Sequence, residues 1–242
     1  MRLRVVSWNV HSWRDSFMRP RFSEMHSILL GLKPQVLCLQ EARWDPEQRV
    51  YSSEIATLRD SLELPGFALC ETHYSPIHKH CVGHVILARS ELVECRSLEL
   101  GKLFHMRRKL LVTQAKDFRP ALTIAATHLS PLPWPAAPGW HWEWLPRCRE
   151  NRQLLGLLEG LPRPLVLAAD LNATPESRDY RRLRELLKEV GHGDVSHVSG
   201  RRVDYVFASP DVEMSRVSIS LSQSPSDHFP VAAEIRAGGF RL

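Results

Sequence analysis

Apolar residues recur along the chain in two spacings, one typical of buried strands and one typical of amphipathic helices. Short apolar runs bounded by turn or polar residues predict strands at residues 3–8, 36–39, 67–71, 82–88, 92–100, 109–116, 121–127, 165–170, 203–208, 214–220 and 231–235. Apolar positions three or four residues apart predict helices at residues 21–32, 46–64, 147–161 and 175–190. For the last helix, Thr174 is the expected N-cap and Pro175 the first helical residue. The pattern therefore predicts an α/β protein.

The order of these elements also indicates how the strands pair. The predicted strands between residues 67 and 127 follow one another without an intervening helix. Parallel neighbours need a long crossover connection, so this part of the sheet system is expected to be largely antiparallel. A chain of 242 residues can bury a substantial core, and we expect residues 1–242 to form a single domain.

One stretch breaks both spacings. Residues 129–146 are rich in proline, which precludes regular structure, and hold four of the seven tryptophans. The side chains of Trp134, Trp140, Trp142 and Trp144 allow three interpretations: stacking on nucleic-acid bases, wedging into lipid headgroups, or packing against the protein's own surface. Trp134, Trp140 and Trp142 are taken as candidate substrate contacts.

Composition changes this picture little. The formal net charge of +5 is a mild basic excess, which favours an anionic partner but is far from the clustered charge of a dedicated nucleic-acid binder. The five cysteines are widely spaced and form no C-x-x-C pair, so neither a disulfide framework nor a thiolate zinc site is indicated. The chain shows no signal peptide and no apolar segment long enough to span a bilayer. We therefore expect a soluble, cytoplasmic protein in a reducing compartment, without stable membrane insertion; no protein partner can be inferred.

Polar side chains of a few types stand at the ends of successive predicted strands. The apolar run at residues 165–170 ends in Asp170, with Asn172 two residues on. Read alone, this corner is as consistent with a turn in which both side chains bond their own backbone as with a catalytic station. Residues of the same types stand at or next to the ends of other predicted strands. The full set is Asn9, Glu41, His128, Asp170, Asn172, Asp204, Asp227 and His228. Strand ends meet when sheets stack, so the set is expected to converge at one rim.

The composition of this set indicates its chemistry. Carboxylates and carboxamides without thiolates favour a hard divalent cation, Mg²⁺ or Mn²⁺. Histidines near such an ion suit proton transfer or stabilisation of developing negative charge. Together they predict metal-assisted hydrolysis of a phosphate ester.

The same residues lie within six ordered motifs: Ser7-Trp8-Asn9, Leu39-Gln40-Glu41, Thr127-His128-Leu129, Asp170-Leu171-Asn172, Arg202-Val203-Asp204-Tyr205 and Ser226-Asp227-His228. This series closely resembles the endonuclease/exonuclease/phosphatase superfamily, over nearly the whole chain. The resemblance implies a four-layer α/β sandwich, with two packed mixed sheets and helices outside.

The resemblance also implies a role for each residue. Glu41 would be the principal metal ligand, with Asn9 and Asp227 completing or orienting the metal shell. Asp170, helped by Asn172, would orient or deprotonate the attacking water. His228, held by Asp204, would contact the scissile phosphate as acid or electrostatic stabiliser, and His128 would contact it from the opposite side.

Three positions depart from the family pattern. His11 stands where similar abasic-site endonucleases carry an Asp near the metal, so one ion is the safer expectation, and His11 becomes a candidate substrate contact. No Glu equivalent to the partner of the His128-type residue in digestive nucleases is evident near residues 82–86, so His128 is not assigned as the acid. Ala168-Ala169 replace the Gly that many members carry before the Asp.

Two further groups of residues are candidates for contacts with substrate or metal. His73, His78, His80 and His84 surround Cys81, but their spacing fits no standard zinc finger, and a loop facing substrate is favoured, with His80 and His84 as candidate phosphate contacts. The arginines that open the helix at 147–161 are Arg147, Arg149 and Arg152; they are either phosphate contacts or a solvated face, and the second is the commoner outcome for such runs.

These observations predict a divalent-metal-dependent phosphodiesterase, foremost a nuclease that acts on DNA or RNA. A sphingomyelinase-like lipid phosphodiesterase or a phosphomonoesterase is the alternative, since the same metal chemistry serves all three. A binding module without catalytic activity is the hypothesis from a different functional class.

Overall fold

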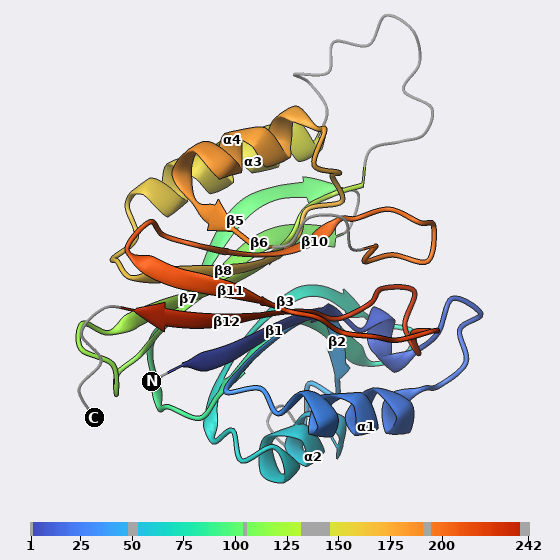
Figure 1. The fold of residues 1–242 in the computed structure, drawn as a ribbon. Coiled ribbons are helices and arrows are strands. Elements are labelled where there is room, and N and C mark those ends of the chain that lie inside the picture. Colours follow the sequence, from blue (N-terminus) through green and yellow to red (C-terminus); the bar gives the residue numbers. More distant parts are fainter. Residues whose placement is uncertain (1, 48–52, 104–105, 132–145, 191–194, 238–242) are drawn as a thin grey trace, which may run out of the picture.

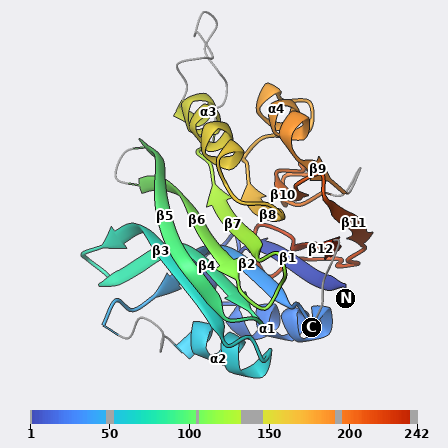
Figure 2. The same cartoon turned by 90° about the vertical axis from the view of Figure 1, so that its left-hand side faces the viewer.

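The computed structural model describes residues 2–47, 53–103, 106–131, 146–190 and 195–237. Two six-stranded mixed sheets lie face to face, and the helices cover their outer faces (Figures 1 and 2). The first sheet has the order β11 (Val212–Val217), β12 (Val231–Ala237), β1 (Leu3–Asn9), β2 (Val36–Trp44), β4 (His80–Ala88) and β3 (Gly66–Ser75). The second has the order β5 (Leu92–Leu103), β6 (Met106–Ala115), β7 (Leu122–His128), β8 (Leu165–Asp170), β10 (Asp204–Ala208) and β9 (Lys188–Glu189). The predicted α/β sandwich is confirmed.

The helices form the two outer layers. In Figure 1, α1 (Phe22–Leu32) and α2 (Ser53–Ser61) lie below the first sheet, while α3 (Pro146–Glu159) and α4 (Arg178–Leu186) lie above the second. A short 3-10 helix (His11–Trp13) follows β1. No helix in the described part of the chain is long and apolar enough to cross a membrane.

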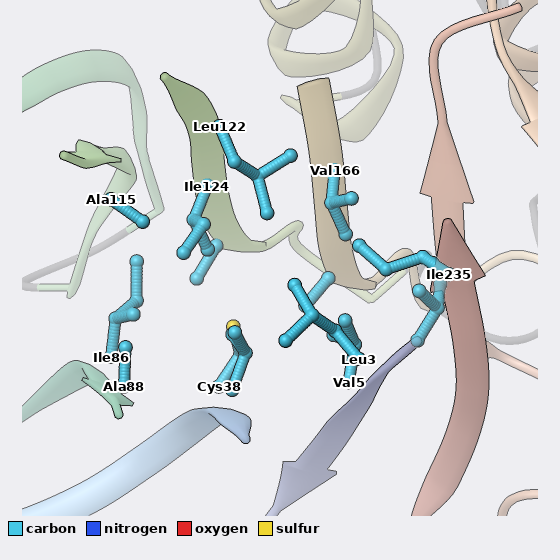
Figure 3. Close-up of a cluster of buried hydrophobic side chains, with 14 of the residues drawn as sticks. Leu3, Val5, Cys38, Ile86, Ala88, Ala115, Leu122, Ile124, Val166 and Ile235 are labelled. Carbon is cyan, nitrogen blue, oxygen red and sulfur yellow. The ribbon is translucent and has the colours of Figure 1, made fainter. Parts of the chain in front are cut away.

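The core consists of three apolar layers, one at each junction between structural layers. Figure 3 shows the middle one, where Val5 and Ile86 of the first sheet face Ile124 and Val166 of the second. Strand side chains alternate between faces, so these buried strands place apolar groups toward both the opposite sheet and the outer helices.

The predicted strand pairing in the middle of the chain is confirmed. Each of the pairs β3–β4, β5–β6 and β6–β7 is antiparallel. The parallel pairs are β1–β2 and β7–β8, and each is joined through a segment that holds a helix. These two parallel pairs place the ends of four strands at one rim, where the polar residues gather.

The boundaries of two helices were predicted wrongly. In the described residues, the helix expected at 46–64 covers Ser53–Ser61 and residues 46–47 form a turn, while residues 48–52 lie outside the described residues. The helix expected at residues 175–190 covers Arg178–Leu186, because Ser177 rather than Thr174 is its N-cap: the Ser177 hydroxyl accepts a hydrogen bond from the Tyr180 N–H. The chain turns extended at Leu187 and adds the two-residue strand β9 to the edge of the second sheet.

Candidate active site

Three neighbouring strands of the second sheet bring three of the predicted residues side by side. His128, the last residue of β7, is the register partner of Asp170, the last residue of β8. Asp170 is in turn the register partner of Asp204, the first residue of β10. The carboxyl ends of parallel strands and the amino end of an antiparallel neighbour share one sheet edge, so strand pairing alone gathers these side chains.

The first sheet contributes the facing half of the site. Asn9 ends β1, and Glu41 lies inside β2, whose register shifts between Leu39 and Ala42. The prediction that Glu41 follows the strand was wrong, because β2 continues to Trp44 through this bulge. Glu41 has a φ of 51°, a left-handed conformation that turns its side chain out of the strand's regular alternation.

The side chain of Asn9 joins the two sheets. Its Nδ2 donates to Glu41 Oε1 at 3.2 Å and to Asp170 Oδ2 at 3.0 Å, while its Oδ1 accepts from the His11 N–H at 3.0 Å. One carboxamide group thus holds a carboxylate from each sheet. Ser226 fixes the Asn9 backbone from the other side, because its hydroxyl donates to the Asn9 carbonyl oxygen at 2.8 Å.

Asp170 is fully buried at the centre of the cluster. Burial and the nearby Asp204 carboxylate raise its pKa to about 6, against the opposing effects of His228 and the Asn9 hydrogen bond. Its Oδ2 also lies 3.5 Å from His128 Nε2 and 3.7 Å from His228 Nε2. A carboxylate with a pKa in this range can accept a proton near neutral pH, which is the property a general base needs.

The corner after β8 fixes the ring of His128. Asn172 has a φ of 48°, and its Nδ2 donates to the Leu129 carbonyl oxygen at 2.9 Å while lying 2.9 Å from His128 Nε2. An amide NH₂ can only donate, so His128 Nε2 is the acceptor and the ring carries its proton on Nδ1, 3.5 Å from Glu41 Oε1. Burial, together with the neighbouring Arg108, His84 and His228, holds the pKa of His128 well below its usual range. His128 is therefore neutral and not suited to be the acid.

His228 forms a close pair with Asp204. The Nδ1 atom of His228 lies 2.8 Å from Asp204 Oδ2, and both side chains are buried. Burial opposes the charged ring, but Asp204, Asp170 and Asp227 outweigh it and raise the pKa of His228 to about 10. The backbone of the pair is also fixed: Trp8 Nε1 donates to the His228 carbonyl oxygen, and the Asp204 N–H donates to Ser196 Oγ, each at 2.9 Å. His228 is thus held as an imidazolium whose Nε2 faces the site.

Asp227 lies between two further histidines. His11 Nδ1 is 3.7 Å from Asp227 Oδ1, and His197 Nε2 is 4.0 Å from Asp227 Oδ2. The ring of His197 meets that of His228 edge to face, with centroids 4.7 Å apart. Sequence reasoning missed His197, because it lies in a non-periodic loop; its place just before the β10 motif is the signal that could have identified it.

Arg147 also differs from its sequence prediction. It is 6% exposed rather than solvated, and its Nε donates to Asp179 Oδ2 at 2.9 Å. Its Nη1 donates to the carbonyl oxygen of Asn172. The ion pair between α3 and α4 therefore clamps the backbone of the corner that positions the Asn172 amide.

The remaining sequence candidates fall outside this cluster. His84 lies inside β4, is 2% exposed and has no hydrogen-bond partner on either ring nitrogen in the described part of the chain, so it is not the surface phosphate contact that the histidine-rich segment suggested. His80 begins β4, and its ring stacks on His78 with centroids 5.8 Å apart. Within the described ranges, no three metal-ligating groups of this hairpin come close enough to hold an ion. Trp134, Trp140, Trp142 and Trp144 lie outside the described residues.

The donor set suits a hard divalent cation. Burial raises the pKa of Glu41, and the charges of Asp170 and Asp227 raise it further, so three carboxylates repel one another at one place. Among the described residues, two groups each offer three ligand atoms that lie within 4.8 Å of one another. The first group is His197, Asp227 and His228, and the second is Asp170, Asp204 and His228. A divalent ion bound to the oxygen atoms would relieve this repulsion, and the cluster contains no thiolate that would favour a softer metal.

Comparison with known proteins places this geometry in a family. The model of the Endonuclease/Exonuclease/phosphatase family matches residues 6–228. A comparison with curated protein sequences gives no match. Members of the matched family hydrolyse phosphoesters, generally with a divalent metal ion.

Solved structures of low sequence identity share the fold. An endonuclease/exonuclease/phosphatase protein from Beutenbergia cavernae has a TM-score of 0.73 and 23% identity, over 99% of this chain and 72% of that one. The catalytic domain of human nocturnin, with a bound sulfate anion, has a TM-score of 0.70 and 18% identity, over 97% and 94%. Sphingomyelinase C from Streptomyces griseocarneus has a TM-score of 0.68 and 17% identity, over 97% and 99%. By its family match and its fold, the chain belongs to the endonuclease/exonuclease/phosphatase family and is a phosphoester hydrolase.

Proposed function

We propose that the protein is a divalent-metal-dependent phosphodiesterase whose substrate is nucleic acid, DNA or RNA. The observation that carries the proposal is the Asn9 carboxamide, which holds Glu41 of one sheet and Asp170 of the other within a single pair of hydrogen bonds. The same rim holds the Asp204–His228 pair. A metal-binding carboxylate, a base and an acid thus stand around one point.

Each residue has a role that follows from its contacts. Glu41 and Asp227, with Asn9 orienting Glu41, would hold a Mg²⁺ or Mn²⁺ ion, which when bound polarises a phosphoryl oxygen and offsets its charge. Asp170, whose pKa of about 6 suits it to take up a proton, orients the attacking water. His228 carries a proton on Nε2 toward the site and stabilises or protonates the leaving oxygen. Neutral His128, fixed by Asn172, shapes the phosphate site from the other side.

The charge of the protein favours nucleic acid over lipid as the substrate. The chain carries a net charge of +5, and the cavity next to Asn172 is lined by Arg147 and Arg201. Cations beside the site attract a polyanion and disfavour the quaternary ammonium of a choline headgroup. A lipid phosphodiesterase, as in the sphingomyelinase with the same fold, is the competing function, and a substrate panel separates the two.

The test measures hydrolysis of single- and double-stranded oligonucleotides, sphingomyelin vesicles and a nucleoside monophosphate, in Mg²⁺ and in EDTA. We expect Mg²⁺-dependent cleavage of the oligonucleotides and a loss of about 10²- to 10⁴-fold in kcat for Asp170→Asn. Glu41→Gln should lose activity and weaken Mg²⁺ binding in calorimetry. Glu213→Gln, an exposed carboxylate on β11, is the matched control and should behave like the wild type. Wild-type rates in Asp170→Asn and Glu41→Gln would refute the catalytic assignment, and cleavage confined to sphingomyelin would refute the nuclease.

A further inference from the structure

A cavity of about 460 Å³ lies beside the corner after β8. Its walls come from the start of α3, the corner that holds Asn172, the start of α4 and the loop before β10. It shares Asn172 and His197 with the candidate active site, so the two spaces adjoin. A volume of this size is within the range of small-ligand pockets.

The lining of this cavity is suited to an anion. Its lining residues include three that carry hydroxyl groups, Thr174, Ser177 and Ser199, and two that carry guanidinium groups, Arg147 and Arg201. None of its described lining residues is acidic. The N-terminus of the nine-residue helix α4 opens here too, since Ser177 is its N-cap, and helix N-termini favour negative charge.

Arg147 gives the cavity a fixed charge rather than a mobile one. The residue is 6% exposed, and it lines the cavity while Asp179 and the Asn172 carbonyl oxygen hold its Nε and Nη1. An immobilised guanidinium loses little further side-chain entropy when an anion binds. The cavity is therefore lined by a guanidinium that is already in place, although Asp179 offsets part of its charge.

We propose that this cavity is a subsite for a second phosphate of the substrate, the one next to the scissile phosphate. The inference rests on the proposed nuclease function and narrows it, because a compound with a single phosphate would leave this subsite unused. A polynucleotide presents phosphates on both sides of the cleaved bond, and its neighbouring phosphate enters the cavity, where Arg147, Arg201 and the hydroxyl groups bind it.

The experiment measures binding without catalysis. A fluorescein-labelled single-stranded oligonucleotide is titrated in EDTA with wild type, Arg201→Gln and Arg201→Lys, and Kd is followed by anisotropy from 50 to 200 mM KCl. Each phosphate contact on a single strand contributes about −0.7 to the slope of log K against log salt, so wild type should lose about 2.5-fold more affinity than Arg201→Gln across this range. Arg201→Lys keeps the charge and should keep the slope.

Arg236→Gln is the matched control, because it removes one exposed arginine at the far end of β12 with the same change in charge. It should leave the slope at the wild-type value. Equal slopes for wild type and Arg201→Gln, a drop of the same size in Arg236→Gln, or no binding by the wild type would each overturn the subsite. Stronger binding to sphingomyelin vesicles than to the oligonucleotide would also overturn it.

The outcomes separate the subsite from the proposed function. If wild type cleaves oligonucleotides but Arg201→Gln keeps the wild-type slope, the subsite is wrong and the nuclease stands. If wild type cleaves no phosphodiester yet its slope depends on Arg201 and not on Arg236, the cavity binds a phosphate of the nucleic acid and the nuclease is wrong.

Discussion

The Asp204–His228 pair makes a quantitative prediction about pH. The Asp204, Asp170 and Asp227 carboxylates outweigh the effect of burial and raise the pKa of His228 from 6.5 to about 10. A rise of the pKa from 6.5 to about 10 corresponds to roughly 5 kcal/mol in favour of the charged ring. Asp204 is the first of the carboxylates in this balance, and its Oδ2 lies 2.8 Å from His228 Nδ1.

The sign of the effect on stability follows from linkage. The unfolded chain titrates its histidine near 6.5, and the folded protein titrates His228 near 10. A pKa raised by folding gives stabilisation that is fully present below pH 6.5 and is lost as the pH rises toward 10. The contribution of the pair to the free energy of unfolding should therefore fall through the alkaline range.

The variant Asp204→Asn removes the charge and keeps the shape of the side chain. The free energy of unfolding of both proteins is measured with urea, in EDTA, from pH 6 to 10. Asp204→Asn should be several kcal/mol less stable than wild type at pH 6 to 7, and this difference should become smaller as the pH approaches 10. A nitrogen-detected NMR titration should show the pKa of His228 lowered by Asp204→Asn. Asp60→Asn, at an exposed carboxylate on α2, is the control and should give a small difference that does not vary with pH. A gap between wild type and Asp204→Asn that is constant from pH 6 to 10, or a wild-type His228 that titrates near 6.5, would refute the reasoning.

Two further predictions concern how the site is held. Arg147→Met leaves the buried carboxylate of Asp179 without its positively charged partner and should lower the free energy of unfolding by about 3–5 kcal/mol in urea. Adding Asp179→Asn should recover much of that stability but not kcat, because the clamp on the corner stays lost; full recovery of kcat would contradict a positioning role. Gly83→Ala, next to the bulge in β2, would place a Cβ 2.0 Å from a backbone carbonyl oxygen and should lower the free energy of unfolding by about 1–3 kcal/mol or more. Gly31→Ala is the control, because its Cβ would meet nothing within 4 Å, and it should be neutral or stabilising. Thermal melts of both variants check these expectations.

The sequence predicted most of the site because strand ends are readable from it. Apolar runs that stop at His128, Asp170 and Asp204 correspond to real strands, and pairing then fixes these residues as neighbours. The motif series added the identity of the family, and the match over residues 6–228 bears that out. Periodicity and motif order together predicted the sandwich, its antiparallel middle and the convergence of the rim.

What the sequence did not predict depends on contacts between distant segments. The burial of Arg147 comes from Asp179, 32 residues away on another helix, whereas charge runs at the start of a helix are usually solvated. The conformation of Glu41 comes from a bulge that forms only where β2 pairs with β4. The choice of Ser177 over Thr174 as cap is a competition between two good caps in one short stretch, which propensity cannot resolve.

The two halves of the site belong to different sheets, so its geometry is a property of how the sheets pack. Asn9 of the first sheet reaches Asp170 of the second over 3.0 Å, and this contact requires the strands to approach closely at the rim. The layer between the sheets contains many small side chains. The buried alanines in it are Ala68, Ala88, Ala115, Ala126, Ala168, Ala208 and Ala233. Close-packed interiors transmit changes of volume, and even small ones are felt at a distance. Ala168, two residues before Asp170, belongs to this layer, so it helps set the sheet spacing on which the approach of Asp170 to Asn9 and Glu41 depends.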